Sequence, residues 1–402
     1  MTRLTDTLFI NANVYTENEV LRGAGVFVQG GKIASILTQQ ELEHHTWDTA
    51  LNVVDLAGKL LLPGFVDVHV HGGGGFDTMK LVSEPGQMEG LSRFAASKGT
   101  TSFLPTTLTD EADRLVKVVG EVRRAMDHGT SGAEILGIHL EGPYLNPKRS
   151  GAQKPEDMRT ATREELDRII ESSGKSVRLI TLAPELDGGM DIIRYLTEQG
   201  ITVSIGHSDA TYEEVKQAVQ YGATHVTHLF NGMSPLHHRE PGVAGAALMM
   251  DELAVEMICD GLHLREELVS YVFRSKPRDK VVLITDAMEA AGLPEGEYML
   301  GKLPVIMRCN KVTLKEGGNL AGSALTMDQA LRNAMTFTNR SLEDILPALT
   351  LNPAKQIGME HRKGSIAKGK DADFVVMHED LTVHSTYVRG SVVYRDPNEV
   401  EA

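Results

Sequence analysis

Several short segments of this 402-residue chain place a histidine, glutamate or aspartate at or just after the end of an apolar run. Imidazole nitrogens and carboxylate oxygens are the donors that Zn²⁺ and Fe²⁺ accept in proteins. A carboxylate beside such donors can also move protons during hydrolysis. The segments therefore indicate metal-assisted acid–base chemistry, and their candidate residues are His69, His71, Glu141, His207, His228, His263 and Asp286.

The spacing of these residues favours a shared metal site. His69 and His71 are two positions apart, so on a β-strand both side chains point to the same face. A single histidine at a strand end is more often a structural hydrogen-bonding group than a ligand. Here, however, several strand ends supply histidine or glutamate and another supplies aspartate. Burying so many ionisable groups without partners would be costly, so we predict that they surround a metal ion.

The elements that must position these residues alternate between strands and helices. Eight apolar runs are separated by amphipathic stretches such as 111–126 and 212–221, several of which end in glycine. Eight strand–helix units predict a (β/α)₈ TIM barrel, in which catalytic groups lie at the carboxyl ends of the strands. A doubly wound open sheet is the alternative α/β fold, but no GxGxxG pattern opens a helix. The predicted strands are 65–70, 101–104, 135–140, 177–182, 201–205, 224–229, 255–258 and 281–285.

Both ends of the chain have a sequence pattern that differs from that of the middle. Residues 8–62 contain short strand-like runs broken by turns, with Gly30 and Gly31 as a hairpin turn. Similar runs return at 373–377, 383–388 and 392–394. Because chain termini often lie close together, we expect the two ends to combine into one small β-sandwich domain. The predicted organisation is a β-domain made of 1–62 and 361–402 around a hydrolase barrel at 63–360.

Composition and charge argue against several other classes of protein. The chain carries 55 acidic and 40 basic residues, a formal net charge of −15, which disfavours nucleic acid and anionic membranes as partners. No window is apolar enough for a membrane helix, and no secretory signal is visible. Cys259 and Cys309 form neither a disulfide pattern nor a zinc pattern. We therefore expect a cytoplasmic protein, and a small phosphorylated ligand would need only a local basic pocket.

The ordered motifs resemble those of a known family. PGFVDVHVHG at 63–72 looks like the opening motif of the amidohydrolase superfamily. Each of the other motifs is short, but the ordered set spans nearly the whole chain and is similar to the N-acetylglucosamine-6-phosphate deacetylase family. These motifs are HLEGP at 139–143, GHS at 206–208, HLFNGM at 228–233, REPG at 239–242, DGLH at 260–263 and TDA at 285–287.

The resemblance implies a ligand set for one or two divalent ions, zinc or iron. Glu141, His207 and His228 would hold the principal metal. His69 and His71 would hold a second ion, next to the first. Some family members lack this histidine pair and work with one ion, but here the pair is intact.

The resemblance also implies the groups that act on the substrate. Asp286 would be the general base and acid, and His263 would contact the sugar or the reacting amide. Asn231, Gly232 and Arg239 would hold a phosphate, with the arginine reaching in from the neighbouring subunit of a homodimer. The other implied substrate-binding positions are Ala152, Gln153, Asp260, Leu320, Ala321 and Gly322. Gln153 stands where some relatives carry a histidine.

The activity implied is metal-dependent hydrolysis of N-acetyl-D-glucosamine 6-phosphate to D-glucosamine 6-phosphate and acetate, in amino-sugar catabolism. The alternatives are an N-acetylgalactosamine-6-phosphate deacetylase, a cyclic-amide hydrolase or a barrel that is only a scaffold. Cyclic-amide hydrolases of this superfamily commonly bridge two metals with a carboxylated lysine. No lysine occupies the strand ends here, and Glu141 offers a carboxylate instead. A scaffold would be expected to lose ligands or Asp286, and the set is complete.

Overall fold

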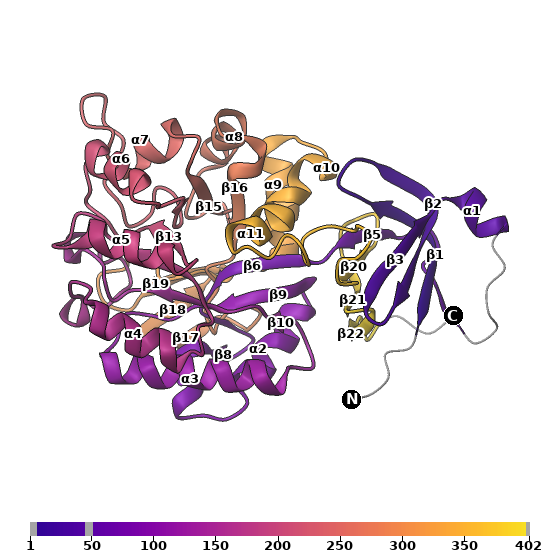
Figure 1. Ribbon diagram of the computed structural model, residues 1–402, viewed down its shortest axis with the longest axis horizontal. Helices are drawn as coiled ribbons and strands as arrows, with labels where there is room; N and C mark the ends of the chain where they lie inside the picture. Colours follow the sequence, from indigo (N-terminus) through magenta and orange to yellow (C-terminus); the bar gives the residue numbers. More distant parts are fainter. Residues whose placement is uncertain (1–5, 45–50, 399–402) are drawn as a thin grey trace.

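The computed structural model describes residues 6–44 and 51–398 of the chain. It consists of a barrel surrounded by helices, on the left of Figure 1, and a β-domain on the right. The predicted strand and helix alternation of the middle of the chain and the predicted β-domain are both confirmed.

Eight parallel strands form the barrel within the described residues. Hydrogen-bonded ladders join six of them in chain order, and bridges from Thr106 to His139 and from Val70 to Ala287 close the ring. The strands are buried on both faces, which explains why their sequences are nearly continuous apolar runs. They are β6 (Phe65–Val70), β9 (Thr100–Pro105), β11 (Ile138–Glu141), β12 (Val177–Leu182), β13 (Thr202–Ile205), β14 (His225–Val226), β15 (Ala254–Ile258) and β16 (Val281–Ile284).

The helices cover the outside of the barrel (Figure 1). Most have one buried apolar face, as in α3, where Leu115, Val118, Val119 and Val122 face the barrel side. The helices are α2 (Gln87–Ala96), α3 (Ala112–His128), α4 (Arg163–Ser172), α5 (Gly189–Glu198), α6 (Tyr212–Gln220), α7 (Gly242–Met249), α8 (Glu266–Ser275), α9 (Met327–Thr338), α10 (Leu342–Ile345) and α11 (Leu351–Gln356).

Short strands outside the barrel ring were not predicted. An antiparallel sheet follows β16 and brings Leu300 to the mouth of the barrel. Its strands are β17 (Gly296–Leu300), β18 (Leu303–Arg308) and β19 (Lys311–Leu314). Two shorter pairings involve β7 (Gly72–Gly73) with β8 (Phe76–Asp77), and β10 (Glu134–Ile135) with β9.

The β-domain combines strands from both ends of the chain in the order β22-β21-β20-β5-β1-β2-β3, with β4 paired to β1. These strands belong to one hydrogen-bonded sheet, whereas a sandwich implies two. The sheet has a core of its own, in which the rings of Phe374 and Tyr387 pack edge-on against Phe9. The strands are β1 (Thr7–Tyr15), β2 (Val20–Gln29), β3 (Lys32–Leu37), β4 (Asn52–Asp55), β5 (Leu60–Pro63), β20 (Phe374–Met377), β21 (Val383–Val388) and β22 (Ser391–Arg395); helix α1 (Gln39–His44) follows β3.

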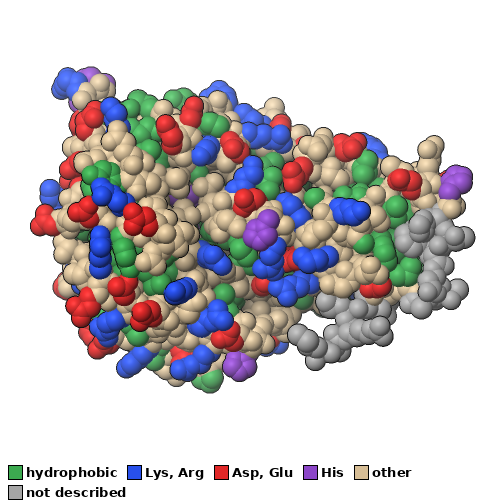
Figure 2. Space-filling model, viewed as in Figure 1, with side chains coloured by type: hydrophobic (Ala, Val, Ile, Leu, Met, Phe, Trp, Pro, Cys, Tyr) green, Lys and Arg blue, Asp and Glu red, His purple; other side chains and the backbone are tan. Residues whose placement is uncertain are grey.

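The predicted domain limits remain a prediction, and residues 1–5, 45–50 and 399–402 of the predicted β-domain lie outside the described residues. Figure 2 shows acidic and basic side chains interspersed over one face of the molecule. Among the helices of the described part, none has both the length and the apolar character needed to cross a bilayer.

Candidate active site

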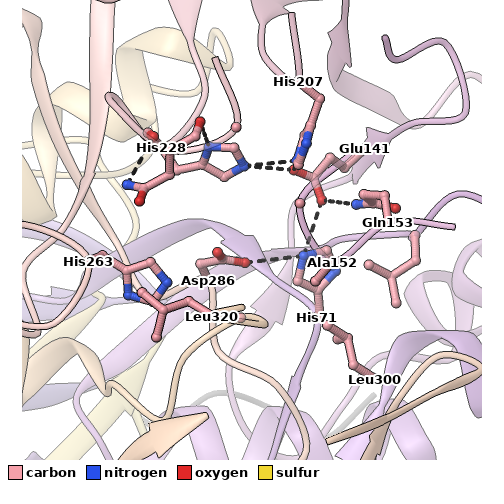
Figure 3. Close-up of a pocket in the computed structure, with 15 residues that line it drawn as sticks. His71, Glu141, Ala152, Gln153, His207, His228, His263, Asp286, Leu300 and Leu320 are labelled. Atoms are coloured by element: carbon pink, nitrogen blue, oxygen red, sulfur yellow. Dashed lines mark hydrogen bonds and ion pairs between the residues drawn. The ribbon is translucent and has the colours of Figure 1, made fainter. Parts of the chain in front are cut away.

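Glu141, His207 and His228 meet at the mouth of the barrel (Figure 3). Glu141 is the last residue of β11, and the two histidines follow β13 and β14 by two residues each. The Glu141 Oε1 atom lies 3.3 Å from His207 Nε2 and 3.2 Å from His228 Nε2. The two Nε2 atoms are 3.2 Å apart. All three side chains are buried, so three strands separated along the chain converge on one point.

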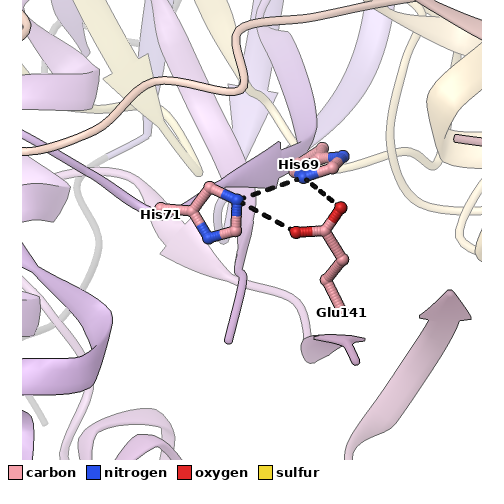
Figure 4. A group of neighbouring side chains, drawn as sticks. All are labelled: His69, His71 and Glu141. Carbon is pink, nitrogen blue, oxygen red and sulfur yellow. Dashed lines mark hydrogen bonds and ion pairs between the residues drawn. The ribbon is translucent and has the colours of Figure 1, made fainter. Parts of the chain in front are cut away.

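His69 and His71 form a second group around the same glutamate (Figure 4). Their Nε2 atoms are 3.3 Å apart. The His71 Nε2 atom lies 3.3 Å from Glu141 Oε2, and the His69 Nε2 atom lies 3.6 Å from Glu141 Oε1. Glu141 therefore lies between two histidine pairs, as a bridging carboxylate would.

Hydrogen bonds on the outer side of the rings determine what three of these histidines can do. In each, Nδ1 faces a backbone carbonyl oxygen, which can only accept, so Nδ1 carries the hydrogen and Nε2 presents a lone pair. Lone pairs and carboxylate oxygens at such short separations repel one another unless a cation lies between them. The donor set therefore fits a divalent metal site. The carbonyl partners are Arg149 for His207 (2.8 Å), Asn231 for His228 (3.1 Å) and Thr106 for His71 (3.3 Å).

The electrostatics of the site favour positive charge. Burial alone would lower the pKa of His71, but hydrogen bonds and charge from Asp286 and Glu141 raise it to about 9. Burial would likewise raise the pKa of Glu141, yet the surrounding histidines hold it well below its usual range. A cation in this cluster would thus be stabilised by buried carboxylates.

Asp286 lies beside the second histidine pair, two residues after the end of β16. Its Oδ1 atom is 3.2 Å from His71 Nε2 and 3.5 Å from His69 Nε2. Its backbone is held on both sides, because its N–H donates to the His69 carbonyl (2.9 Å) and its carbonyl accepts from the Ser323 N–H (2.7 Å). A carboxylate in this position can exchange a proton with a group bound next to the metal ligands.

Three of these residues have left-handed backbone conformations, which side chains other than glycine rarely adopt. The φ angles are +47° at His207, +27° at His228 and +48° at Asp286. Such conformations concentrate at functional sites, where the surrounding structure maintains them. Gly232, with φ +58°, packs closely on the site, because a Cβ there would lie 2.9 Å from His207 Nδ1.

The cavity next to the histidine–glutamate cluster is lined by many of the predicted substrate-binding residues (Figure 3). Leu108 and Leu300 also line it and were not predicted. No motif marks Leu300, because it belongs to the unpredicted β17–β19 sheet. The predicted residues in the lining are Ala152, Gln153, Asn231, Gly232, His263, Leu320 and Gly322.

The structure places three predicted substrate-binding residues outside this lining. Asp260 lies behind His263, and its Oδ2 atom is 2.7 Å from His263 Nδ1. Ala321 is fully buried. Arg239 lies in the exposed loop before α7, where its Nη1 is 2.8 Å from His238 Nε2.

Gln153 contacts the metal-ligand cluster directly. Its Nε2 donates to Glu141 Oε2 at 2.7 Å, and its Oε1 accepts from the Thr109 N–H at 2.7 Å. The backbone donor fixes the orientation of the amide, so the side chain must present N–H groups to Glu141. Gln153 therefore holds Glu141 in place through a hydrogen bond to its carboxylate.

Two residues of the site were missed from the sequence. Glu256 lies within the predicted strand 255–258 and His225 within the predicted strand 224–229, and neither is among the predicted site residues. In the structure the His225 Nε2 atom is 3.1 Å from Glu256 Oε1, and both side chains are fully buried. A lone carboxylate inside an otherwise apolar strand was the available indication, since such a group needs buried partners.

The chain is similar to known proteins over most of its length. The amidohydrolase family profile matches residues 60–393. An N-acetylglucosamine-6-phosphate deacetylase of Bacillus subtilis is 40% identical over 384 residues, which cover 95% of each chain. An N-acetylgalactosamine-6-phosphate deacetylase of Escherichia coli O157:H7 is 36% identical over 342 residues, covering 85% of this chain and 90% of the relative.

A solved structure is similar over almost the whole fold. It is an aspartate-to-alanine variant of N-acetyl-D-glucosamine-6-phosphate deacetylase from Mycobacterium smegmatis in complex with N-acetyl-D-glucosamine-6-phosphate. The TM-score is 0.88 at 30% sequence identity, and the match covers 97% of this chain and 99% of the other. The family predicted from the motifs is thereby confirmed. The chain belongs to the amidohydrolase family and, within it, to the N-acetylglucosamine-6-phosphate deacetylases.

Proposed function

We propose that this protein hydrolyses N-acetyl-D-glucosamine 6-phosphate to D-glucosamine 6-phosphate and acetate, as a step of amino-sugar catabolism. The observation that carries the proposal is the buried cluster of four histidines and Glu141 beside Asp286, on the floor of an open cavity. Relatives that are similar over nearly the whole chain carry the same activity in their names. The left-handed backbones of His207, His228 and Asp286 argue against an inactive scaffold, because such strain is typical of functional sites.

The chain's own residues suffice for the proton transfers of amide hydrolysis. A divalent metal, when bound, lowers the pKa of water and polarises a carbonyl. We assign Asp286 as the base that takes a proton from water and as the acid that returns it to the departing amine. Burial and its neighbours set its ionisation, because burial raises the pKa of Asp286 while His69 and His71 lower it, with a net lowering. The carboxyl group is thus ionised and ready to accept a proton.

We propose two metal ions, zinc or iron, held on either side of Glu141. Glu141, His207 and His228 would hold the principal ion. His69 and His71 would hold the second, and the approach of each pair to Glu141 supports this division. Zinc and iron fit these ligands about equally well, since imidazole and carboxylate suit both.

The substrate would lie with its acetyl group over the metals and its phosphate toward Asn231 and Gly232. We assign His263 to the sugar or amide, supported by Asp260, which holds the ring through Nδ1. Four lining residues would shape the cavity around the sugar, and buried Ala321 would hold the backbone between two of them, Leu320 and Gly322. The four lining residues are Ala152, Gln153, Leu320 and Gly322.

Arg239 would complete the phosphate site of the neighbouring subunit in a homodimer. Its planar guanidinium can bind two phosphate oxygens at once. In a single chain it is exposed and outside the cavity lining, which supports a role across an interface. Exposed large apolar side chains on or near α7 and α8 support the same surface as the interface: Leu236, Met249, Leu262, Leu268 and Tyr271.

Hydrolysis assays over a panel of amides test the proposal, with acetate release measured for the N-acetyl sugars and loss of ring ultraviolet absorbance measured for the cyclic amide, which contains no acetyl group. The panel contains N-acetylglucosamine 6-phosphate, its galacto epimer, unphosphorylated N-acetylglucosamine and a cyclic amide such as dihydrouracil. We expect the highest kcat/KM for N-acetylglucosamine 6-phosphate. The galacto epimer is the second candidate, because one relative that is 36% identical acts on it by name. Preference for the unphosphorylated sugar or for the cyclic amide would contradict the proposal.

The cytoplasmic location stays a prediction. Cys259 is buried and Cys309 is exposed, and both are free thiols in the structure.

A further inference from the structure

Glu256 is a carboxylate in the middle of β15, and it is fully buried. A buried carboxylate without partners would be strongly destabilising, so its contacts show what keeps it there. Its Oε2 atom lies 3.0 Å from His69 Nδ1 and accepts a hydrogen bond from the His228 backbone N–H at 3.2 Å. Its Oε1 atom lies 3.1 Å from His225 Nε2.

The contact with His69 determines how that ring can act. A carboxylate only accepts hydrogen bonds, so the His69 Nδ1 atom must donate. The His69 Nε2 atom then presents its lone pair toward His71 and Glu141, where the second ion is proposed. Among the four ligand imidazoles, His69 is the one whose outer partner is a carboxylate, whereas the others face backbone carbonyls. A charged acceptor strengthens the hydrogen bond and makes the imidazole a better ligand.

The contact with His228 joins the two ligand groups. The same Oε2 atom that accepts from His69 also accepts from the backbone of His228, whose φ is +27°. One carboxylate oxygen of Glu256 therefore fixes both the ring orientation of His69 on β6 and the backbone of His228 after β14. The His225 side chain, on the other oxygen, holds the carboxylate itself in place.

We infer that Glu256 is a positioning residue that orients His69 as an Nε2 ligand and sets it against His228, so that the two ligand groups are spaced for two ions. The inference rests on the proposed two-metal site. It concerns metal binding and not the identity of the substrate, so a failed deacetylase assay would leave it testable.

Zinc titration of the metal-free protein by calorimetry tests this role. The variants are Glu256→Leu, which removes the acceptor, and Glu256→Gln, which keeps an acceptor oxygen without charge. Asp110→Asn is the matched control, since Asp110 is another buried carboxylate but pairs with Arg114 and Lys302. Circular dichroism and the thermal midpoint report whether each variant is folded.

The parent should bind two zinc ions per chain in two resolved steps. Glu256→Gln should weaken one step by about 10-fold and Glu256→Leu by about 100-fold, the range found for outer partners of metal ligands. The other step should weaken less, because Glu256 contacts His228 through the backbone N–H and not through the ring. The Asp110→Asn isotherm should match the parent. If Glu256→Leu does not fold, Glu256→Gln decides the matter. Parent-like isotherms for folded Glu256 variants would overturn the inference. So would equal weakening of both steps, or a parent that binds only one zinc ion per chain.

Discussion

Replacing Asp286 by asparagine removes the proposed proton carrier while changing little else. Asparagine has the same shape and tolerates the left-handed backbone found here, φ +48°. The backbone bonds to His69 and Ser323 do not involve the side chain and should persist. The proposed ligands of the principal metal, Glu141, His207 and His228, are unchanged, so metal content should be retained. The variant therefore isolates the carboxylate's chemistry.

The expected loss follows from the two steps assigned to this side chain. Its Oδ1 atom lies 3.2 Å from His71 Nε2, close enough to reach a water bound beside the metal ligands. General acid–base catalysis contributes about 10²–10⁴-fold, and both the base and the acid step would be lost. We therefore expect kcat to fall roughly 10⁴-fold, equivalent to about 5.4 kcal/mol of transition-state stabilisation. KM should change little, because the neutral side chain still fills its place.

The assay measures release of D-glucosamine 6-phosphate as a primary amine, with elemental analysis on the same sample. Asp110→Asn is the control, since Asp110 is a buried carboxylate that pairs with Arg114 and Lys302 outside the metal cluster. Asp110→Asn should keep kcat near the parent value. An Asp286→Asn enzyme that retains its metal and turns over within about tenfold of the parent would refute the assigned role.

Three further predictions concern the cavity, its pH dependence and the thiols. Arg239→Ala should raise KM for the phosphorylated sugar by about 10–100-fold, because a charge-assisted hydrogen bond worth about 1.5–3 kcal/mol is lost. Steady-state kinetics should show no such change for the unphosphorylated sugar. An equal rise in KM for both sugars would show that Arg239 does not bind the phosphate. Burial lowers the pKa of His263, but the hydrogen bond and charge of Asp260 raise it overall. The contact with Asp260 therefore stabilises the folded protein while His263 is protonated, and this stabilisation is lost as the pH rises through the raised pKa. Urea unfolding should therefore show a larger loss of stability for Asp260→Asn at pH 6 than at pH 9, and a loss independent of pH would contradict this. A thiol reagent should modify Cys309 in the native protein and spare Cys259, which is buried and whose pKa is raised by burial and by Asp260; both should react after unfolding.

The barrel could be predicted closely because buried parallel strands have a clear sequence pattern. The run at 177–182 matches β12, and the run at 281–285 includes all of β16. The predicted run at 224–229 is much longer than β14 (His225–Val226), because the chain turns into the site at His228 with a positive φ. The β17–β19 sheet has no counterpart in the predicted pattern, since its strands are short and only partly buried.

The candidate site was predictable where chemistry coincides with strand ends. His69, His71 and Glu141 could be grouped because barrel strands present their carboxyl ends to one mouth. Glu256 could not, because its position in the middle of β15 carries no motif, and its role depends on partners from β6 and β14. Its function follows from contacts between strands distant in sequence, and only the fold reveals these.

The central claim is that Glu141, His207 and His228 hold one metal ion, and an anomalous-scattering map from crystals of the metal-loaded protein tests it most directly. Data collected on both sides of the absorption edge of the metal identify the ion and its position. We expect a peak about 2.0–2.2 Å from Nε2 of both histidines and from a Glu141 oxygen. A metal-loaded crystal whose map lacks a peak at these three side chains, or places it elsewhere, would contradict the account.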